Sequence, residues 1–425
     1  MKIAHTGDTH IRMAHKRWLT LDRALRDMVA QMREHEPDLI VHAGDLGEPN
    51  PTAQDLYCQA VFLQDLADIA PTIVVAGNHD SIPHLEVLAR IETLHPLWIS
   101  TSPDTLALAD GQILQLSDLG LDEIESVDLV IHALPWPAKG NLLARLPQMP
   151  SSDESDQVAR QLLLDIFRGF KAERETAGYE GPSILLGHLE VHGARMDSGQ
   201  PVAGPGLKVG VEDLKETGAD GALLGHIHAR QRLSDETHVV YSGSPCRLTW
   251  GEAGAEGKGW GLLDFDPAMA RHDAPVVYEW VDVPSPRLWT VEAEWESNLD
   301  NIGENIVWQF VATKMDRDEA GALQKLAEPD DELRFRYHVP EDQREAAKEQ
   351  AEKEIASIWP GKRENVTVEA IVIPTDKARA PEIARLDDPS QMFDRWIAAE
   401  GHDLPEERRA RLQLLMNQVL QEVAS

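Results

Sequence analysis

The sequence predicts an α/β protein with at least two domains. Through the first half of the 425 residues, short apolar runs alternate with segments of helical periodicity, which is typical of parallel strands joined by helices. A second, smaller set of strand and helix patterns begins after Asp266, and two amphipathic helical patterns follow it. A chain of this length can form an ample hydrophobic core in each of two domains.

Five apolar runs are expected to be buried parallel strands, and each is followed by a glycine and then by polar residues. The glycine would let the backbone turn sharply, so that the polar residues emerge at the carboxyl end of the strand, where open α/β sheets bind ligands. The five strand ends could then converge on one crevice. The runs are residues 2–5, 39–42, 72–76, 183–186 and 221–224.

Other elements are predicted from periodicity and turn residues. A strand at 127–134 and a helix at 151–177 precede the fourth run. The loop at 193–210 is rich in Gly, Pro and Ser, and it is either a lid on the substrate side or an ordinary surface excursion. After Asp266, strands are expected at 276–284, 288–295, 333–339 and 365–373, and helices at 314–327 and 341–359.

The polar residues after the five runs are the side chains that a two-metal phosphoesterase centre needs. Two divalent ions about 3.5–4 Å apart require a shared carboxylate, together with imidazoles and oxygens for each ion. Asp45 is the predicted bridge, because it stands alone after its strand. The other predicted ligands are Asp8, His10 and one of His226 and His228 for the first ion, and Asn78, His188 and the other histidine for the second.

The ligand chemistry narrows the choice of metal. Mixed imidazole, carboxylate and amide ligands suit Mn, Fe or Zn better than Ca, and the absence of thiolates from the set argues against a structural zinc site. Each segment alone is a weak signal, since Asp and Asn also cap helices. The joint pattern is specific, and it predicts two divalent ions per chain. The other strand histidines, His5, His42 and His132, are expected to be ordinary hydrogen-bonded residues.

This set of segments resembles the calcineurin-like metallophosphoesterases, and its order and flanking sequence most resemble the SbcD-type DNA double-strand-break nucleases. The narrower resemblance rests on HALPW at 132–136, GHLEVHGA at 187–194 and YSGSPCRL at 241–248. It implies a β-sandwich flanked by helices in a nuclease domain at 1–266, a small α/β capping domain at 267–375, and a linker with a C-terminal helix pair at 376–425.

The resemblance also implies an activity, namely Mn²⁺-dependent DNA cleavage as an exonuclease on duplex ends and an endonuclease on single strands; Mg²⁺, Fe²⁺ or Zn²⁺ are the alternative metals. It gives His79 the role of steadying the transition state or protonating the leaving oxygen, which suits an imidazole. Asp80 would support this site or cap the next helix, and we favour the cap. Relatives usually carry His or Asp where this chain has Glu48, and we expect this carboxylate still to orient His79.

The net charge of -33 is unusual for a protein that binds DNA, because the summed field would repel a polyanion. Bound cations, and screening by salt beyond about 8–10 Å, would weaken this repulsion at the site. Basic residues beside the motifs are candidates for contacts with DNA phosphates, with ordinary solvated surface as the alternative. These candidates are Arg12, Lys16, Arg17, Arg195, Arg230 and Arg247.

Two amphipathic helices are predicted near the end of the chain, at 389–400 and 405–423. Two short helices after a linker cannot bury both apolar stripes between themselves. The stripes either pack on their own domain or, as the resemblance implies, bind an SMC-like ATPase of the SbcC type in a complex that contains a nuclease homodimer. The stripe residues are Met392, Phe393, Trp396, Leu412, Leu415, Met416 and Val419.

Composition limits the cellular setting and leaves two other functions open. No apolar run approaches the length of a membrane helix, and the start of the chain has no signal-peptide pattern, so we expect a cytoplasmic protein. Cys58 and Cys246 are expected to remain thiols. The alternatives to a nuclease are another calcineurin-like phosphoesterase, acting on nucleotides, phosphoproteins or lipid headgroups, and a catalytically weak scaffold subunit.

Overall fold

The structure is a computed structural model, and its described residues fall into two compact units that we treat separately. The first unit comprises Met1–Trp289, Ala327–Leu333 and Gly361–Asn365. The second comprises the described residues of Thr290–Leu326, Arg334–Pro360 and Val366–Ser425. The described residues are 1–120, 122–202, 206–234, 238–253, 257–266, 277–298, 307–312, 327–373, 411 and 415.

The first unit is built on two β-sheets. In the six-stranded sheet, with the order β15-β14-β1-β2-β3-β4, strands β1 to β4 are parallel and the other two are antiparallel to their neighbours. These strands are β1 (Lys2–Thr6), β2 (Leu39–His42), β3 (Thr72–Val75), β4 (Leu97–Ser100), β14 (Gly259–Asp264) and β15 (Val277–Asp282).

The second sheet has seven strands in the order β12-β13-β11-β8-β7-β5-β6, and β7, β8, β11 and β13 are parallel. A short parallel pair, β9 (Glu190–Val191) with β10 (Lys208–Val209), lies outside both sheets. The strands of the second sheet are β5 (Asp104–Ala109), β6 (Gln112–Gln115), β7 (Val127–Leu134), β8 (Ser183–His188), β11 (Gly221–Gly225), β12 (Gln231–Ser234) and β13 (Val239–Tyr241).

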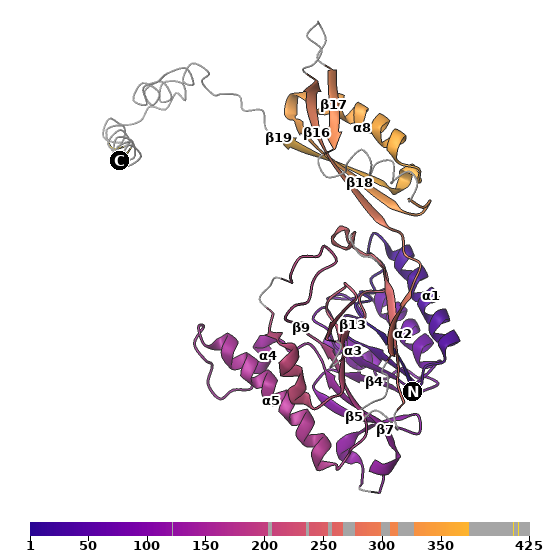
Figure 1. Ribbon diagram of the computed structural model, residues 1–425, viewed down its shortest axis with the longest axis vertical. Coiled ribbons are helices and arrows are strands. Elements are labelled where there is room, and N and C mark those ends of the chain that lie inside the picture. The colour runs from indigo at the N-terminus through magenta and orange to yellow at the C-terminus, as the bar shows by residue number, and fades with distance from the viewer. Residues whose placement is uncertain are drawn as a thin grey trace. The chain divides into compact units, whose positions relative to one another are not determined.

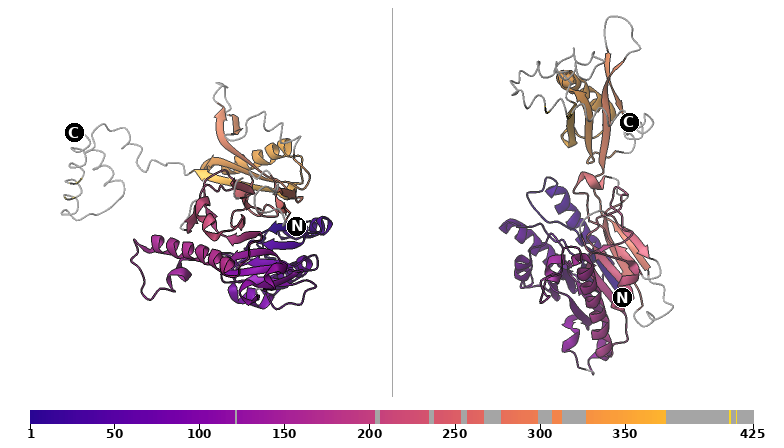
Figure 2. Two further views of the ribbon diagram at one scale, coloured as in Figure 1. Left: turned by 60° about the horizontal axis from the view of Figure 1, so that its bottom comes forward. Right: turned by 90° about the vertical axis from the view of Figure 1, so that its left-hand side faces the viewer.

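The two sheets pack face to face, and helices cover both outer faces. In β2, Leu39 and Val41 belong to the core between the sheets, whereas Ile40 packs with the helices, because successive side chains point to opposite faces of a strand. The two groups of helices flank the sheets in Figure 1, and Figure 2 shows this unit from two further directions. The helices are α1 (Trp18–His35), α2 (Ala53–Ala67), α3 (Ile82–Leu88), α4 (Lys139–Leu143), α5 (Ser155–Thr176) and α6 (Val211–Leu214).

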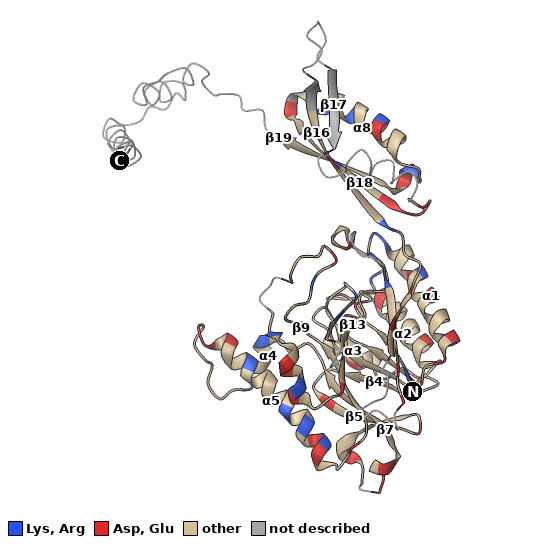
Figure 3. Ribbon diagram, in the orientation of Figure 1, with Lys and Arg blue, Asp and Glu red and all other residues tan. Residues whose placement is uncertain are grey.

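The outer helices are amphipathic. On α1 the buried side chains Leu21, Leu25, Met28 and Met32 recur three or four residues apart, which places them on one face against the first sheet. On α5, Lys and Arg are interspersed with Asp and Glu along the exposed side, as Figure 3 shows. The described part of α5 therefore carries a mixed-charge surface rather than a basic stripe.

The five predicted ligand-bearing strands are confirmed, and so is the β-sandwich that the resemblance implied, because these strands are divided between two packed sheets. β1, β2 and β3 belong to the first sheet, whereas β8 and β11 belong to the second. Their carboxyl ends meet where the two sheets adjoin, and the five strand ends converge there as expected. The strand predicted at 276–284 is β15, and it pairs with β14. This strand, which we had grouped with the second domain, therefore lies in the first unit.

The second unit contains a four-stranded sheet in the order β17-β16-β18-β19, on which α8 packs (Figure 1). The buried residues Phe335, Tyr337 and Val339 alternate along β18, as the sequence predicted for this segment. The predicted helix at 314–327 lies almost entirely outside the described residues. The elements are β16 (Leu288–Asn298), β17 (Val307–Ala312), β18 (Glu332–Pro340), α8 (Arg344–Ile358) and β19 (Val366–Ile373).

No helix among the described residues is both long enough and apolar enough to cross a membrane.

Candidate metal centre

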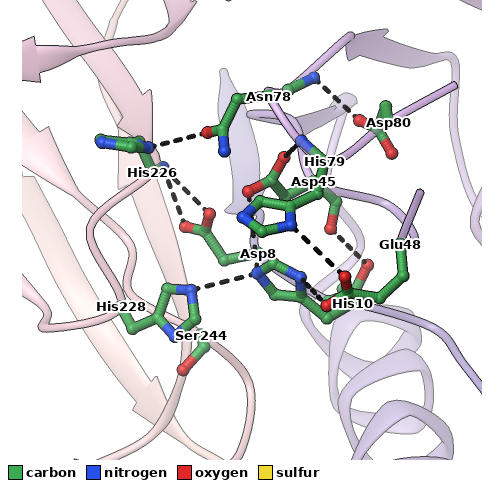
Figure 4. A network of polar contacts seen from close by, with 12 residues as sticks. Asp8, His10, Asp45, Glu48, Asn78, His79, Asp80, His226, His228 and Ser244 are labelled. Atoms are coloured by element: carbon green, nitrogen blue, oxygen red, sulfur yellow. Dashed lines mark hydrogen bonds and ion pairs between the residues drawn. The ribbon is translucent and has the colours of Figure 1, made fainter. Parts of the chain in front are cut away.

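The predicted ligands meet where the ends of β1, β2 and β3 face those of β8 and β11. Figure 4 shows Asp8, His10 and Asp45 on one side, with His226 and His228 opposite them. Three groups have their ligand atoms within 4.8 Å of one another. They are Asp8 with His10 and His228, Asp8 with Asp45 and His188, and His10 with Glu48 and His79. The amide oxygen of Asn78 lies 2.9 Å from His188 Nε2 and 2.9 Å from His226 Nδ1. The structure thus gathers all seven predicted ligands.

The Asp45 carboxylate occupies the shared position. Its Oδ2 lies 3.4 Å from His188 Nε2 and 3.7 Å from His10 Nε2, so one oxygen faces ligands from both predicted ion sites. Its Oδ1 accepts a 2.8 Å hydrogen bond from the backbone N–H of His79. From this position the Asp45 carboxylate would be able to bridge two ions.

Hydrogen bonds set the ring nitrogen that each buried histidine offers to an ion. His188 Nδ1 donates to the carbonyl oxygen of Ala43 at 2.7 Å, because a carbonyl can only accept, and this leaves the Nε2 lone pair for a ligand. His10 Nδ1 donates in the same way to Glu48 Oε1 at 2.9 Å. Both histidines therefore present Nε2 to the centre.

The spacing of two imidazoles fits a shared cation. His10 Nε2 and His228 Nε2 are 3.1 Å apart, while His228 Nδ1 lies 3.4 Å from Glu252 Oε1. Two nitrogens at this separation can both bind one ion at about 2.1 Å, the usual metal–imidazole distance. This geometry would put His228 with Asp8 and His10 at the first ion, and His226 with Asn78 and His188 at the second.

Electrostatics also favour cations among these ligands. Burial alone would lower the pKa of His188, but the Asp45 and Asp8 carboxylates outweigh it and raise the pKa to about 9. His10 shows the same balance, because Glu48 and Asp45 overcome burial and raise its pKa to about 9. The site attracts positive charge, which divalent ions supply in place of these protons.

Four of the ligands lie on strained backbone. Asp8, His10, Asp45 and His226 have φ values of 51°, 46°, 54° and 94°. Positive φ is uncommon for residues other than glycine, and each instance costs on the order of 1–3 kcal/mol. Such strain persists where surrounding contacts enforce it, here the bonds from Asp8 N to Gly44 O at 2.9 Å and from His10 N to Asp45 O at 3.0 Å.

The motif glycines serve mainly to admit close approach. The glycines that follow the five apolar runs are Gly7, Gly44, Gly77, Gly187 and Gly225. Among these five, only Gly44 has a positive φ, so the prediction that glycine makes each turn holds at Gly44 alone. A Cβ at Gly44 would lie 2.4 Å from His188 Nδ1, and one at Gly77 would lie 2.1 Å from Asp45 Oδ1. Glycine is needed at these positions because the ligand-bearing loops touch there.

Glu48 contacts both His10 and the predicted catalytic residue His79. Its Oε2 lies 3.3 Å from His79 Nδ1, and its Oε1 accepts the bond from His10 Nδ1 (Figure 4). The His79 side chain is 43% exposed, so it faces the open side of the centre. The Glu48 carboxylate raises the pKa of His79, which favours the protonated imidazole. The position of Glu48 agrees with the expectation that it orients His79.

Asp80 does not cap the following helix, so our favoured interpretation of this residue was wrong. Ser81 is the N-cap of α3. The Asp80 carboxylate instead accepts hydrogen bonds from the backbone N–H groups of Gly77 at 2.8 Å, Gly47 at 3.0 Å and Leu46 at 3.3 Å. Asp80 therefore ties the loop after β3 to the loop after β2, and it supports the centre through the backbone.

Two of the predicted phosphate contacts are buried instead. The Arg17 guanidinium bonds to Glu332 Oε1 at 2.7 Å and to the carbonyl of Leu248, and only 7% of Arg17 is exposed. Arg247 is 6% exposed and donates to the carbonyl of Ser285 at 3.3 Å. These contacts leave neither guanidinium available to a DNA phosphate, which corrects that prediction for both residues.

The other four basic candidates lie nearer the surface. Arg12, Lys16 and Arg195 are exposed, whereas Arg230 is partly buried and pairs with Asp282. Of the predicted partner-binding residues, Leu415 is described as helical and half exposed. The remaining predicted partner-binding residues, Met392, Phe393, Trp396, Leu412, Met416 and Val419, lie outside the described residues.

The other strand histidines differ from one another. His5 Nδ1 lies 2.9 Å from the Tyr278 hydroxyl, and His42 Nε2 lies 3.1 Å from Thr9 Oγ1, so both are hydrogen-bonded as expected. His132 stacks on Phe170, with 5.0 Å between ring centroids. Neither of its nitrogens has a hydrogen-bond partner among the described residues, which corrects the expectation for this histidine.

Sequence reasoning missed two charged residues behind His228. Glu252 lies beside its Nδ1, and Lys258 is buried against Glu252 with 3.0 Å between Nζ and Oε2. Both residues follow the last ligand motif by more than twenty positions. The only nearby signal was the segment at 241–248, which ends just before Glu252.

Comparisons with known proteins place the chain in a family. The family model for calcineurin-like phosphoesterases matches residues 1–230, which is more than half of the chain. One similar solved structure is the crystal structure of TT1561 from Thermus thermophilus, with 14% sequence identity and a TM-score of 0.35. The match covers 65% of this chain and 97% of that one. A dimetal phosphatase from Danio rerio is 12% identical, with a TM-score of 0.39 and coverages of 62% and 92%. On the family match and the gathered ligands, the chain belongs to the calcineurin-like phosphoesterase family, whose members are metal-dependent hydrolases with a dimetal centre.

Proposed function

We propose that the chain is a Mn²⁺-dependent DNA nuclease of the SbcD type, which hydrolyses phosphodiester bonds at this centre. The observation that carries the proposal is the complete set of seven ligands with His79 beside them on the open side. The choice of DNA as substrate is supported by the motif order and by the three flanking segments that resemble SbcD-type nucleases.

The side chains around the centre have distinct roles in such a reaction. A pair of divalent ions held by the seven ligands would supply Lewis acidity for the phosphoryl oxygens and lower the pKa of a bound water. His79 donates a proton to the leaving oxygen through Nε2, because its Nδ1 faces Glu48. Glu48 raises the pKa of His79, which favours its protonated form, and it holds His10 in the orientation that presents Nε2. Asp80 fixes the loop that carries Asn78 and His79.

One observation favours a second candidate. The net charge of -33 opposes the approach of DNA, and Arg17 and Arg247 are buried. These features would suit a phosphoesterase that acts on nucleotides or phosphoproteins, which present fewer negative charges than a long duplex. The motif resemblance supports the nuclease, and a comparison of substrates separates the two candidates.

The test compares cleavage of several substrates by the full chain in Mn²⁺. They are end-labelled duplex DNA, circular single-stranded DNA, bis(p-nitrophenyl) phosphate and a phosphoserine peptide. The assay is run at two ionic strengths, because repulsion slows the encounter most at low salt. The proposal expects shortening from duplex ends and nicking of the circle. Efficient hydrolysis of the small esters with no action on DNA would contradict it, and His79→Ala protein purified in parallel excludes a contaminating nuclease.

We also propose that the segment at 376–425 binds an SMC-like ATPase of the SbcC type, in a complex that contains a nuclease dimer. The support is the pair of apolar stripes that two short helices cannot bury alone. Full-length chain should co-purify with such an ATPase, and a chain that lacks residues 380–425 should not. His79→Ala in the full chain is the matched control, because it alters the centre and leaves residues 380–425 in place. Unchanged co-purification of the truncated chain would refute this assignment.

A further inference from the structure

Lys258 lies at the centre of a buried polar cluster behind the metal ligands. It is 2% exposed, and its ammonium group lies 2.9 Å from Asp197 Oδ2, 2.9 Å from Ser244 Oγ and 3.0 Å from the carbonyl oxygen of His228. Lysine is almost never buried unless it is paired, because an unpaired charge is costly to desolvate. These contacts, with the Glu252 carboxylate as a further partner, satisfy the ammonium group completely.

Glu252 connects this lysine to a ligand of the first ion. Its Oε2 lies 3.0 Å from Lys258 Nζ, and its Oε1 lies 3.4 Å from His228 Nδ1. Backbone N–H groups of Thr249 and Leu248 also donate to Glu252, at 3.2 Å and 3.4 Å. The Glu252 carboxylate is therefore held from several directions, and it presents one oxygen to the imidazole.

His228 is the ligand that most needs such support when it is compared with His10 and His188. The His228 side chain is 27% exposed, whereas those of His10 and His188 are 7% and 0% exposed. Packing alone therefore constrains His228 less. A carboxylate at Nδ1 favours the tautomer in which Nε2 carries the lone pair, and it limits rotation of the ring.

The cluster also joins the loop at 193–210 to the same ligand. Asp197 belongs to that loop, and its side chain is 5% exposed in its pairing with Lys258. A contact path therefore runs from Asp197 through Lys258 and Glu252 to His228. Another lysine of the loop region, Lys208, pairs with Glu190 at a place with no described link to His228. Lys208 therefore serves as a control for Lys258, because it is also a lysine paired with a glutamate.

We propose that Glu252 and Lys258 are positioning residues of the metal centre. Glu252 orients His228 so that its Nε2 faces the first ion, and Lys258 holds Glu252 in place and anchors the loop through Asp197. The inference rests on the two-metal centre of the proposed function and not on its DNA substrate. Its test therefore reads metal binding rather than DNA cleavage.

The experiment titrates EDTA-treated, dialysed full-length protein with MnCl₂ by calorimetry and records electron paramagnetic resonance spectra at two equivalents of Mn²⁺. Glu252→Gln keeps the size and an acceptor for His228 but removes the charge, while Lys258 retains Asp197. We expect one of the two sites to weaken by about 10–100-fold, the usual effect of removing the partner of a ligating histidine. The spectrum should change from that of a coupled ion pair to that of isolated ions. Lys258→Met should do the same or more.

Lys208→Met is expected to keep both sites and the coupled spectrum. Wild-type affinity and coupling in Glu252→Gln would overturn the proposal, as would an equal loss in Lys208→Met, since that would mark a general loss of stability. Should Lys258→Met fail to fold, Glu252→Gln decides the question alone. A wild-type chain that binds two ions but cuts no DNA would overturn only the DNA substrate.

Discussion

The first three ligand-bearing loops support one another, whereas the last two depend on distant parts of the chain. After β1 and β2, backbone bonds run directly between the loops, and Ile11 forms a bridge with Gly47. The Asp80 carboxylate accepts hydrogen bonds from Gly47 and Gly77, and these bonds tie the loop after β3 to the loop after β2. In the second sheet, His188 is fixed by Ala43 of the first sheet, and His228 is supported by Glu252.

This difference shows that the ligands of one centre can be held in two ways, either by bonds among the ligand-bearing loops or by residues from other parts of the chain. The early half carries three of the strained residues, Asp8, His10 and Asp45, and it holds them by backbone hydrogen bonds between the loops after β1 and β2. In the late half, His188 donates to the carbonyl oxygen of Ala43, and His228 is supported by Glu252, which lies beyond residue 230, where the family match ends. Substitutions at Asp45, which joins the two halves, and at His79 and Glu48 in the early half should therefore differ in their effects on metal binding and on activity.

The largest effect is expected for Asp45→Asn, because Asp45 joins the two halves. An amide there cannot supply the shared negative charge, and it faces His10 and His188 across 3.7 Å and 3.4 Å. Loss of the bridging carboxylate should remove several kcal/mol of metal-dependent stabilisation and lower activity by about 10⁴-fold or more. Metal content by elemental analysis and hydrolysis of bis(p-nitrophenyl) phosphate measure both. A variant with two ions and full activity would contradict the bridge.

His79→Ala should lower kcat by about 10²–10³-fold while metal content stays near that of the wild type. The reason is that His79 faces the open side and is not one of the seven predicted ligands, although its backbone N–H bonds to Asp45. That backbone bond survives the substitution. Steady-state kinetics on a DNA substrate, with metal analysis of the same sample, provide the measurement. Loss of metal together with activity would show that His79 is a ligand instead.

Glu48→Gln is expected to lower kcat by about 10–100-fold, since Glu48 orients one ligand and one catalytic residue. The loss of its charge should also lower the pKa of His79, so the alkaline limb of the rate profile should move to lower pH. A pH–kcat profile of the variant tests this shift. Glu34→Gln, at an exposed position of α1, is the matched control and should leave the profile unchanged. An unshifted limb in Glu48→Gln would remove Glu48 from this role.

The ligands could be predicted from sequence because each one directly follows an apolar strand. Strand ends are local properties, and β2 and β7 begin and end at the predicted residues. The resemblance implied a sandwich of two sheets, but the local pattern of each strand could not show which sheet it joins. Sheet membership depends on pairing between distant segments, such as β1 with β14, and nothing in the pattern of either strand specifies that partner.

The supporting residues could not be predicted for the same physical reason. Arg17 follows the first motif, which suggested a phosphate contact, but its partner Glu332 lies 315 positions away. Lys258 and Asp197 are 61 positions apart and are brought together only by folding. A ligand must stand at a strand end, whereas a residue that orients it can come from any segment that packs nearby.

The smallest expected effect is on the pH dependence of stability. It involves two groups of histidines whose pKa values are shifted in opposite directions. His10 and His188 have a pKa of about 9, above the usual 6.5, so their stabilisation is present below pH 6.5 and is lost as the pH rises through 9. Burial lowers the pKa of His5, His42 and His132 to about 3, so their stabilisation is present above pH 6.5 and is lost as the pH falls towards 3.

EDTA-treated protein should therefore be most stable near pH 6.5, with Tm falling on both sides by a few degrees per pH unit. Each histidine contributes on the order of 1 kcal/mol per pH unit to these slopes. With Mn²⁺ bound, the ions take the place of the protons on His10 and His188, so the decline above pH 6.5 should disappear while the decline below it remains. Calorimetric Tm values from pH 5 to 9, with and without Mn²⁺, test this. The same alkaline decline in both samples would mean that the ions do not bind at these two imidazoles.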